Sequence, residues 1–398
     1  MTSTPNTKDD ALAGIRVLDF TSMIAGPYAS RLMADLGAEV IKIEPPGGED
    51  MRQRAPLRDG HSSYFGQLNA GKKSVILDLK NPRAIALVKR LVETADVLIE
   101  NYRPGVIARM GLDYATLAAI NPRLVYCSIS GYGQSGPDAN RPAYAPIVHA
   151  ASGFDKALME YAGDRDQPAA GAVFIADLLG GIYAMSAIQT ALLQRARTGL
   201  GQRVDVALMD CMLNLLVYEL QAAQLPGIGP RLTYGPNSAL DGHIMVAPIT
   251  LRNFTALCEA IGRPELKTDE RFTSVGGRSD NWSALMDHVE SWSRERTVAQ
   301  CMAALDAAGV PAAPYNTPAD ALANPHLLQR GLFTQVADGA GAFTGINPPY
   351  RLSASMADLR SPVPQKGEHT RAVLCGLLGL DEKQLQSLGV GGTADSHE

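Results

Sequence analysis

One carboxylate, Asp177, interrupts the long apolar stretch VFIADLLGGIYAMSAI at residues 173–188, and Gly180 and Gly181 follow it. A carboxylate in such surroundings is costly unless something satisfies it. When it is partly desolvated, it is also a stronger nucleophile than it is in water. The glycines would let other backbone groups come close, as a loop that holds a tetrahedral oxyanion requires. Two interpretations follow from the residues alone: Asp177 caps a helix that starts here, or it attacks a substrate.

Sequence signatures of other chemistries are missing. The chain has no G-x-x-x-x-G-K-[ST] loop, no G-x-G-x-x-G directly after its first expected strand and no G-x-S-x-G elbow. Its seven histidines show no H-x-x-H or H-E-x-x-H spacing. The five cysteines are an odd number without a C-x-x-C pair, which argues against a zinc site and a disulfide framework. These absences favour a reaction that uses a carboxylate side chain and no metal ion.

The composition narrows the class of partner. Of the 398 residues, 46% are hydrophobic and 19% are charged, and the net charge of −5 comes without a run of five basic residues. We therefore expect no nucleic-acid and no membrane partner, while a local basic site for one anionic ligand remains open. The polar start MTSTPNTKDDALAG lacks a signal-peptide core, and no membrane span is expected. The sparse cysteines favour a reducing, cytoplasmic setting.

Short apolar runs typical of strands alternate with helical segments in the first part of the chain. This alternation predicts an α/β fold with a mostly parallel sheet that is covered on both faces. Ligands of such sheets lie at the carboxyl ends of the strands. From 173 to about 222 the pattern is helical throughout, with a turn at 197–202. The expected strands are residues 15–21, 39–46, 73–79, 96–101 and 124–133, and the helices among them include residues 25–38 and 82–95.

Two stretches rich in Gly and Pro, residues 223–242 and about 331–364, interrupt this pattern and are typical of linkers. Between them, residues 251–310 are expected to form a helical second domain. Its Trp282 and Trp292 are interpreted as core or interface residues, because buried aromatic side chains usually serve packing.

Several motifs together resemble the class III CoA-transferases, the CaiB/BaiF-like family of formyl-CoA transferase and carnitine CoA-transferase. The motifs are AGP, EPPGG, ENYRPG, SGYGQ-x-GP and R-x-x-TG-x-GQ. The resemblance begins with GIRVLDFTSMIAGPYASRLMADLGAEVIKIEPPGGEDMR and ends with GVPAAPYNT and GEHTRAVLCGLLGL. It covers nearly the whole chain, and its pattern is highly specific.

The resemblance implies a fold. A large Rossmann-like domain with a parallel sheet would be joined to a smaller α+β domain, in an interlocked homodimer whose subunits thread through each other. The large CoA-binding domain would comprise residues 1–222, and the small domain with its linkers residues 223–335. The chain would return to the large domain at 336–398. The two linkers suit this arrangement, because threading needs long connections.

For catalysis, the resemblance implies a ping-pong acyl transfer with Asp177 as the nucleophile. Its carboxylate attacks the thioester of an acyl-CoA and forms a mixed anhydride. The released CoA thiolate then attacks the aspartyl carbonyl, which gives a covalent aspartyl-CoA thioester, and the incoming acid reverses the sequence. Coenzyme A is thus a substrate, and neither a tightly bound cofactor nor a metal is expected.

By position in the motifs, CoA would contact the residues after the first and fourth strands. Arg109 is favoured as a phosphate partner because a guanidinium pairs well with phosphate, and the alternative is a solvated helix charge. Lys72 is a further candidate for a phosphate. The implied CoA-binding residues are Ser22, Met23, Ala25, Lys73, Asn101, Tyr102, Val106 and Arg109.

The family also contains α-methylacyl-CoA racemases, whose G-H-D-x-N-Y element carries a catalytic histidine. In the matching stretch AYAPIVHAASG, Tyr144 stands in place of that histidine. Tyrosine, with a pKa near ~10, is a poor base for moving an α-proton. His149 lies five residues further on, and we interpret it as a packed histidine. A racemase-like enzyme and a non-catalytic CoA-binding homologue remain as alternatives to a transferase.

The acyl end of the site would be lined by Tyr144, Arg52, Ile24, Gly180 and Gly181. Formyl-CoA transferase has a glutamine at the position of Ile24 and a glycine-rich lid where this chain has the compact YGPNSALDGHIMVAP, so formate and oxalate are doubtful substrates.

The segment after the second strand, GGEDMRQRAPLRDGHSSYF, offers three arginines near the acyl end: Arg52, Arg54 and Arg58. One of them would bind the distal carboxylate of a small dicarboxylic or hydroxylated acid. The alternative is that these arginines bind CoA phosphates or lie in solvent.

Overall fold

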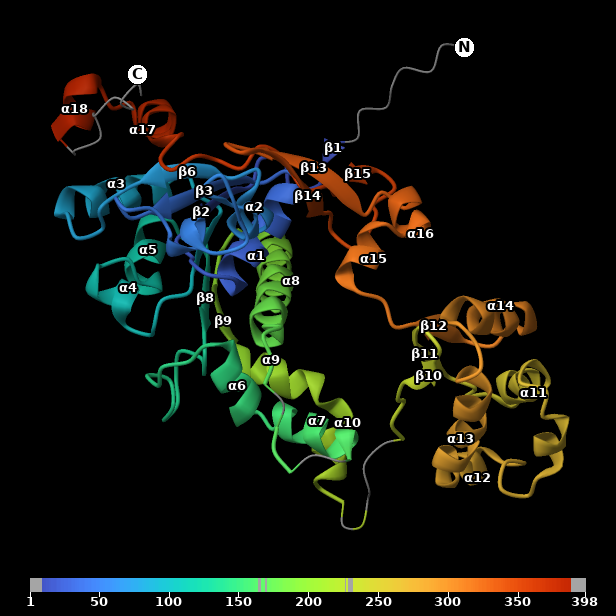
Figure 1. Ribbon diagram of the computed structural model, residues 1–398. Coiled ribbons are helices and arrows are strands. Elements are labelled where there is room, and N and C mark those ends of the chain that lie inside the picture. Colours follow the sequence, from blue (N-terminus) through green and yellow to red (C-terminus); the bar gives the residue numbers. More distant parts are fainter. Residues whose placement is uncertain (1–8, 164–165, 169, 226, 228–231, 388–398) are drawn as a thin grey trace. The chain divides into compact units, whose positions relative to one another are not determined.

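The computed structural model describes residues 9–163, 166–168, 170–225, 227 and 232–387 (Figure 1). The chain divides into two compact units. One combines Met1–Gln224 with Gln329–Glu398, and the other is Leu225–Leu328. The return to the first unit therefore begins at residue 329, whereas the sequence placed it at 336.

The first unit is built on a six-stranded sheet whose strands are all parallel, in the order β6-β3-β2-β7-β8-β9. Its strands are β2 (Arg16–Asp19), β3 (Glu39–Glu44), β6 (Lys73–Ile76), β7 (Val97–Glu100), β8 (Val125–Ser130) and β9 (Arg203–Ala207). The predicted α/β class is confirmed. The strand order reverses direction between β2 and β7, which is where doubly wound sheets bind their ligands.

The last strand corrects an expectation. The sequence predicted helix from 173 to about 222, yet β9 lies within that range and pairs with β8. β9 is an edge strand in which Arg203 and Asp205 are exposed. It therefore lacks the continuous apolar run that identifies a strand buried on both faces.

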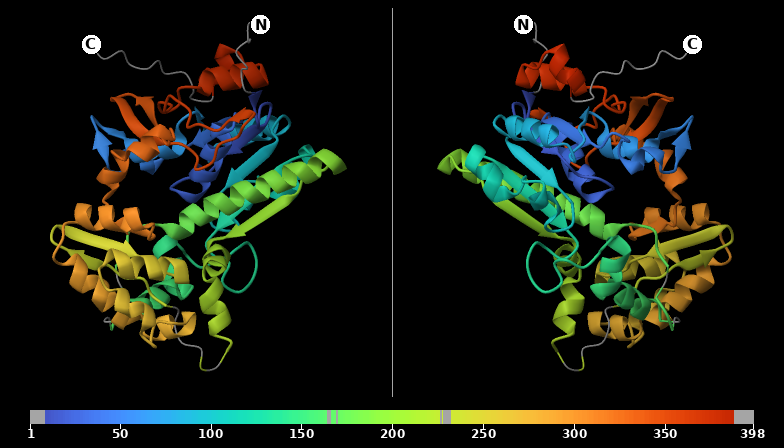
Figure 2. Two further views of the ribbon diagram at one scale, coloured as in Figure 1. Left: turned by 90° about the vertical axis from the view of Figure 1, so that its right-hand side faces the viewer. Right: turned by 90° about the vertical axis from the view of Figure 1, so that its left-hand side faces the viewer.

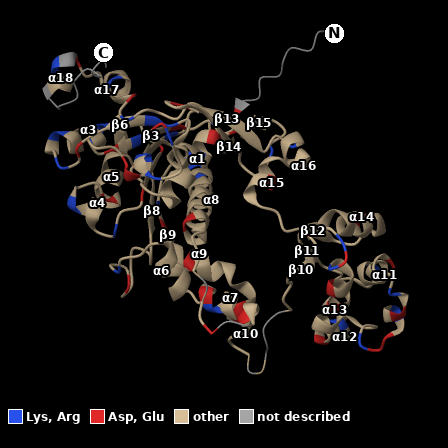
Figure 3. Cartoon of the chain, viewed as in Figure 1, with Lys and Arg blue, Asp and Glu red and all other residues tan. Residues whose placement is uncertain are grey.

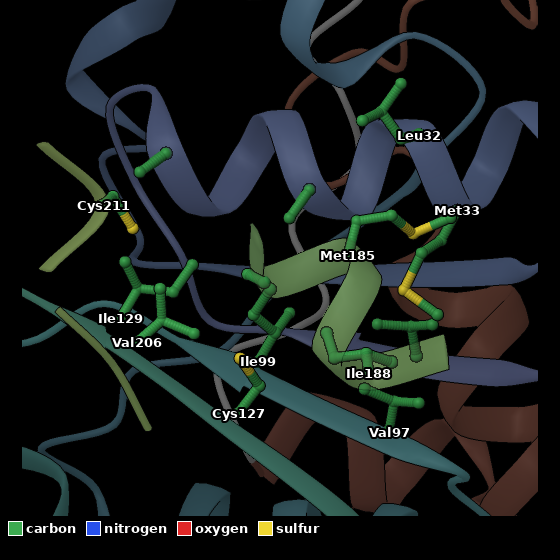
Figure 4. Close-up of a cluster of buried hydrophobic side chains, with 14 of the residues drawn as sticks. Leu32, Met33, Val97, Ile99, Cys127, Ile129, Met185, Ile188, Val206 and Cys211 are labelled. Atoms are coloured by element: carbon green, nitrogen blue, oxygen red, sulfur yellow. The ribbon is translucent and has the colours of Figure 1, made fainter. Parts of the chain in front are cut away.

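Alternate side chains of β2, β3, β7 and β8 enter two different cores, so these central strands are buried on both faces. On one face, Val97, Ile99 and Cys127 pack against Met185 and Ile188 (Figure 4). The helices of this face are α1 (Ala25–Asp35), α8 (Ile175–Thr198) and α9 (Leu208–Leu215). The helices of the other face are α3 (Pro82–Val92), α5 (Tyr114–Ile120) and α17 (Thr370–Leu378).

Helix α8 carries the apolar stretch around Asp177. Figures 1 and 2 show it as a long green helix beside the strands, and most of it is tan in Figure 3 because it holds few charges. It is the one helix in the described ranges that is long and apolar enough to cross a membrane by length and composition. Its Ala184, Ile188 and Ala191 lie in the core between α1 and the sheet.

A smaller apolar cluster joins distant parts of the chain within the first unit. Helix α2 (Ser63–Asn69) contributes Phe65 and Leu68, and the hairpin of β13 (Phe333–Asp338) and β14 (Gly341–Ile346) contributes Val336. Ile24, at the start of α1, belongs to the same cluster. Helix α4 (Val106–Arg109) follows β7, α6 (Ala145–Ala151) packs against α8 and α9, and α7 (Phe154–Ala162) packs against α6.

The second unit has its own core. Its antiparallel sheet consists of β10 (Asn237–Ala239), β11 (Gly242–Val246) and β12 (Ala312–Pro314). Its helices are α11 (Leu251–Ala260), α12 (Val275–Asp280), α13 (Trp282–Ser293) and α14 (Val298–Ala308). Trp282 and Trp292 both pack in this core, the role predicted for them.

Candidate active site

Asp177 is the third residue of α8, whose N-cap is Phe174. The capping interpretation is therefore wrong, although the carboxylate still lies in the first turn, where the helix dipole favours a negative charge. The side chain is half-buried. Burial raises the pKa of Asp177 to about 6. The carboxylate is thus ionised near neutral pH and is less strongly solvated than an exposed one.

His149 holds the start of this helix. Its Nε2 accepts a hydrogen bond of 3.0 Å from the backbone N–H of Ala176, next to Asp177. The imidazole is buried and packs 5.6 Å from the ring of Phe154, centroid to centroid. Burial lowers the pKa of His149, against a smaller opposing effect of Asp155. The ring therefore stays neutral and can accept. The sequence predicted a packed histidine but not this bond, which spans 27 residues.

Gly180 and Gly181 have a different role from the one expected. Both are buried inside α8 and do not form a loop. A Cβ on Gly181 would lie 2.8 Å from the carbonyl oxygen of Ala25, and one on Gly180 would lie 2.4 Å from Cδ2 of Leu208. The glycines therefore let α1 and α9 pack closely against α8, and neither is among the residues that line the pocket beside the first turn of this helix.

A pocket of about 620 Å³ opens beside the first turn of α8. Tyr64 on α2 lines this pocket and was not predicted from the sequence. Burial and the negative charge of Asp177 raise the pKa of Tyr64, so its hydroxyl group lies close enough to Asp177 to be affected by the carboxylate. Ile24, predicted at the acyl end, is also on this wall. The lining residues are Ile24, Tyr28, Arg31, Tyr64, Gln67, Leu68, Ala172, Val173, Phe174, Leu178, Leu332, Ile346, Asn347 and Pro349.

A second pocket, of about 220 Å³, lies at the carboxyl ends of the strands where their order reverses. Ser22, Met23 and Tyr102, all predicted to bind CoA, line it. Asn101 joins the two strand ends, because its amide accepts from Ser22 N at 2.9 Å and donates to Ser22 O at 2.8 Å. Ala25 is buried against α8, so its side chain does not face this pocket.

Two other predicted CoA residues lie on α4, after β7. Val106 is half-buried, and Arg109 is exposed at the end of the helix. Arg109 forms no ion pair within the described ranges, so its guanidinium is available to an anion.

The two adjacent lysines differ. Lys72 is fully buried and donates to Asp19 at 2.9 Å, Asn69 at 2.8 Å and Pro27 O at 3.0 Å. Burial lowers its pKa to about 8, although Asp19 opposes this. Lys72 is therefore not a phosphate partner. Lys73 has a half-exposed side chain, which pairs with Glu39 at 2.5 Å.

The three arginines proposed near the acyl end are also different from one another. Arg52 binds both carboxylate oxygens of Glu44, at 2.6 and 2.7 Å, and lies over the ring of Phe65. Arg58 binds both oxygens of Asp338, at 2.8 and 2.9 Å. Arg54 is exposed and pairs with no carboxylate in the part of the chain that the structure describes. An acceptor would thus have to displace a bidentate partner at Arg52 or Arg58, but not at Arg54.

Tyr144 lies at the N-cap of α6, and 65% of it is exposed. Among the described residues, no group of three or more His, Cys, Asp or Glu side chains is arranged to hold a metal ion.

Comparison with known proteins gives the family. The family model of CoA-transferase family III matches residues 12–370. The chain is 36% identical to the succinate–glutarate CoA-transferase of Agrobacterium fabrum over 396 residues, with 95% of this chain and 98% of the relative covered. It is 35% identical to the succinyl-CoA–D-citramalate CoA-transferase of Chloroflexus aurantiacus, with 95% and 96% covered.

Solved structures of similar proteins support the same family. A CaiB/BaiF family protein from Brucella suis is 35% identical and superposes with a TM-score of 0.81, covering 93% of this chain and all of the other. The Rv3272 protein of M. tuberculosis is 33% identical and has a TM-score of 0.83, with 92% and 99% covered. The resemblance drawn from the motifs is confirmed: the chain belongs to the family III CoA-transferases.

Proposed function

We propose that this CoA-transferase moves CoA from a dicarboxylic acyl-CoA, such as succinyl-CoA, to a small free dicarboxylic acid, through covalent intermediates on Asp177. The observation that carries the proposal is the half-buried Asp177 in the first turn of α8, with its pKa raised to about 6. The pocket of about 620 Å³ beside this turn is the proposed acyl site.

The proposed reaction is a double displacement. A carboxylate oxygen of Asp177 attacks the thioester carbonyl, and the C–S bond breaks as the electron pair leaves on the CoA thiolate. The thiolate attacks the aspartyl carbonyl of the mixed anhydride, which releases the free acid and leaves an aspartyl-CoA thioester. The acceptor carboxylate repeats these steps in reverse. Tyr64 would donate its hydroxyl hydrogen to a developing oxyanion, and His149 would hold the first turn of α8 in place.

The choice of substrate follows from the relatives and from the charges nearby. The two relatives reported above are named for succinate, glutarate and D-citramalate, and other relatives are named for oxalate. A distal carboxylate needs a cation, and the exposed Arg54 is our candidate. Ile24 places an apolar side chain in the pocket, which fits a short methylene chain better than formate or oxalate. Tyr144 would approach the acceptor in the assembled enzyme.

We also propose that Ser22, Met23, Asn101, Tyr102, Val106 and Arg109 bind CoA. The pocket at the strand ends supports this, because ligands of doubly wound sheets bind there. Lys73 begins β6, at the amino ends of the strands, so it would contact a CoA phosphate only outside this pocket. Arg109 is the proposed phosphate partner. The five cysteines, none of which is paired, support a reducing, cytoplasmic setting.

An interlocked homodimer is proposed as the working assembly. It is supported by apolar side chains on the outer face of α8, where Leu178 is 37%, Ile182 46% and Leu193 72% exposed. Such exposure on a long helix is typical of a surface that another chain covers. Native dimers with and without a tag should not exchange subunits over hours, and rapid appearance of mixed dimers would contradict interlocking.

The covalent step can be tested directly. Wild-type enzyme incubated with succinyl-CoA and then treated with hydroxylamine or borohydride should be modified at Asp177, as seen by peptide mass. Asp177→Ala should keep its fold and its affinity for CoA but lose the exchange of label between succinyl-CoA and free acid. Full exchange in Asp177→Ala would rule out the mechanism. Rapid, Asp177-dependent uptake of deuterium at the α-carbon of a 2-methylacyl-CoA would instead indicate a racemase.

The substrate class needs its own comparison. We expect kcat/KM for glutarate, succinate and citramalate to exceed the values for acetate, butyrate, formate and oxalate. Arg54→Gln should raise KM for glutarate and leave KM for butyrate unchanged. A monocarboxylate that is preferred by more than about tenfold, or ~1.4 kcal/mol, would contradict the role of a distal cation.

A further inference from the structure

Met23, at the turn between β2 and α1, has a left-handed backbone with φ +65°. In the described ranges, Asp59 is the one other non-glycine residue with positive φ. This conformation is unfavourable for any residue that carries a Cβ, and it persists only where the surroundings hold it. The question is what holds Met23.

A buried ion pair provides the answer. Oε1 of Glu49 accepts the backbone N–H of Met23 at 2.7 Å, and Oε2 lies 2.6 Å from Nζ of Lys42. Lys42 in turn donates to the carbonyl oxygen of Thr21 at 2.8 Å. Both charged side chains are buried. Although burial works against its charge, Glu49 and Asp19 raise the pKa of Lys42, so the ammonium group stays protonated.

The other side of the turn is fixed as well, because the Asn101 amide binds both backbone groups of Ser22. The backbone from Thr21 to Met23 is thus held from β3 by the Glu49–Lys42 pair and from β7 by Asn101. This turn lines the pocket of about 220 Å³ on one side. It leads directly into Ala25, whose carbonyl oxygen packs against Gly181 of the helix that carries Asp177.

We infer that Glu49 is a positioning residue for CoA. Through its pair with Lys42, it holds Met23 in the left-handed conformation, and this presents the Ser22–Met23 backbone to the CoA thioester. Glu49 and Lys42 also line this pocket, but the role inferred for Glu49 is exerted through the turn. Rescue by a change at Met23 distinguishes that role from a direct contact of Glu49 with CoA. The inference rests on the proposed location of CoA at this pocket, but not on the chemistry of Asp177.

The test removes the negative charge of Glu49 and, in a second step, the unfavourable left-handed conformation of Met23. Glu49→Gln keeps an acceptor for Met23 N–H but removes the charge-assisted bond, so the Kd of free CoA measured by calorimetry should rise about tenfold or more. KM for succinyl-CoA should rise in parallel, with a smaller change in kcat. Because Met23 itself lines the pocket, Met23→Gly is also measured alone. Adding Met23→Gly to Glu49→Gln should bring the Kd to within about threefold of that single variant, because glycine adopts positive φ without a steric penalty.

Thermal melting distinguishes an effect of Glu49 on the turn from an effect on the stability of the whole protein. Lys42 stays buried without its partner in both Glu49→Gln variants, so the double variant should keep the lowered Tm while it regains CoA affinity. Asp59→Gly is the matched control, since it makes the same kind of change at an exposed turn and should leave the Kd within about twofold. An unchanged Kd in Glu49→Gln, or a raised Kd that Met23→Gly does not restore, overturns the inference. Because the readout is the binding of CoA alone, either result leaves the test of the aspartyl intermediate unaffected.

Discussion

Gly181 in α8 and Ala25 at the start of α1 are in main-chain contact: a Cβ on Gly181 would lie 2.8 Å from the carbonyl oxygen of Ala25. Gly181 is four residues from the proposed nucleophile Asp177, and Ala25 is two residues from Met23 in the proposed CoA turn. The contact therefore fixes the distance between the group that would attack and the turn that would hold the thioester.

Gly181→Ala should separate the two helices. A backbone oxygen cannot rotate away as a side chain does, so we expect a loss of about 1–3 kcal/mol in the free energy of unfolding and a fall in kcat. Urea denaturation and steady-state kinetics would measure both. Gly376→Ala is the control, because Gly376 lies inside α17 and a Cβ there would meet nothing within 4 Å. That variant should be as stable as wild type or up to about 1 kcal/mol more stable.

The sequence predicted the parallel sheet because its strands are apolar runs, and their burial on both faces requires such runs. β9 could not be recognised in this way, since its Arg203 and Asp205 are exposed at the edge of the sheet. The motifs located Asp177, but its raised pKa results from burial that only the fold creates. The pairing of Gly181 with Ala25 likewise depends on how α1 crosses α8.

The contacts of charged residues were the hardest to predict. Lys72 and Lys73 are the same residue type at adjacent positions, yet one is buried on Asp19 and the other is half-exposed. Lys72 precedes β6 and its side chain enters the core at Asp19, whereas Lys73 is the first residue of β6 and pairs with Glu39, and composition does not reveal this difference. The hydrogen bond from Ala176 to His149 also joins elements that meet only in the folded chain.

The bond between His149 and Ala176 leads to a prediction about the start of α8. His149→Gln retains an acceptor for the Ala176 N–H, whereas His149→Leu leaves that group unsatisfied at a cost of about 1–3 kcal/mol. We therefore expect kcat and the Tm to fall further in the leucine variant than in the glutamine variant. Equal activity in both variants would show that the hydrogen bond does not position Asp177.

This bond should also depend on pH. Burial lowers the pKa of His149 below its ordinary value, so the unfolded chain binds more protons than the folded one as the pH falls through that range. The free energy of unfolding of the wild type should therefore decrease relative to His149→Gln on acidification below about pH 6.5. Parallel urea titrations at several pH values would measure the difference.

Lys72 and Lys73 offer a paired test of stability. Lys72→Met leaves the carboxylate of Asp19 buried without its closest cation, which should cost about 3–5 kcal/mol in the free energy of unfolding. Lys73→Met should cost no more than about 1 kcal/mol, because its pair with Glu39 is partly exposed. A rise in KM for succinyl-CoA in Lys73→Met would support its proposed role at a CoA phosphate.

The loss in Lys72→Met should shrink in acid. Burial alone would raise the pKa of Asp19, but the positive charges of Lys72 and Lys42 outweigh it and lower this pKa to about 2 in the folded state. The stabilisation by this carboxylate is therefore complete above its unfolded pKa of about 4 and is lost as the pH falls toward 2. A stability difference between variant and wild type that does not change between pH 7 and pH 3 would contradict this assignment.

The raised pKa of Asp177 should make the activity depend on pH. Burial raises this pKa to about 6, and the proposed nucleophile is the ionised carboxylate. The value of kcat/KM for succinyl-CoA should therefore increase with pH and reach half its maximum near pH 6, because this ratio reports the free enzyme. An exposed aspartate, with a pKa near 3.9, would give a flat profile over the same range.

The same shift predicts the sign of a stability effect. The folded state binds the Asp177 proton more tightly than the unfolded state does, so the wild type loses stability as the pH rises from about 4 to about 6. Asp177→Asn should therefore be inactive yet more stable than the wild type at pH 7.5, and the two should converge near pH 4. Urea denaturation of both proteins at the two pH values would measure this. If Asp177→Asn is no more stable than the wild type at pH 7.5, burial does not destabilise the ionised carboxylate of Asp177. The reactivity of this carboxylate must then have another source.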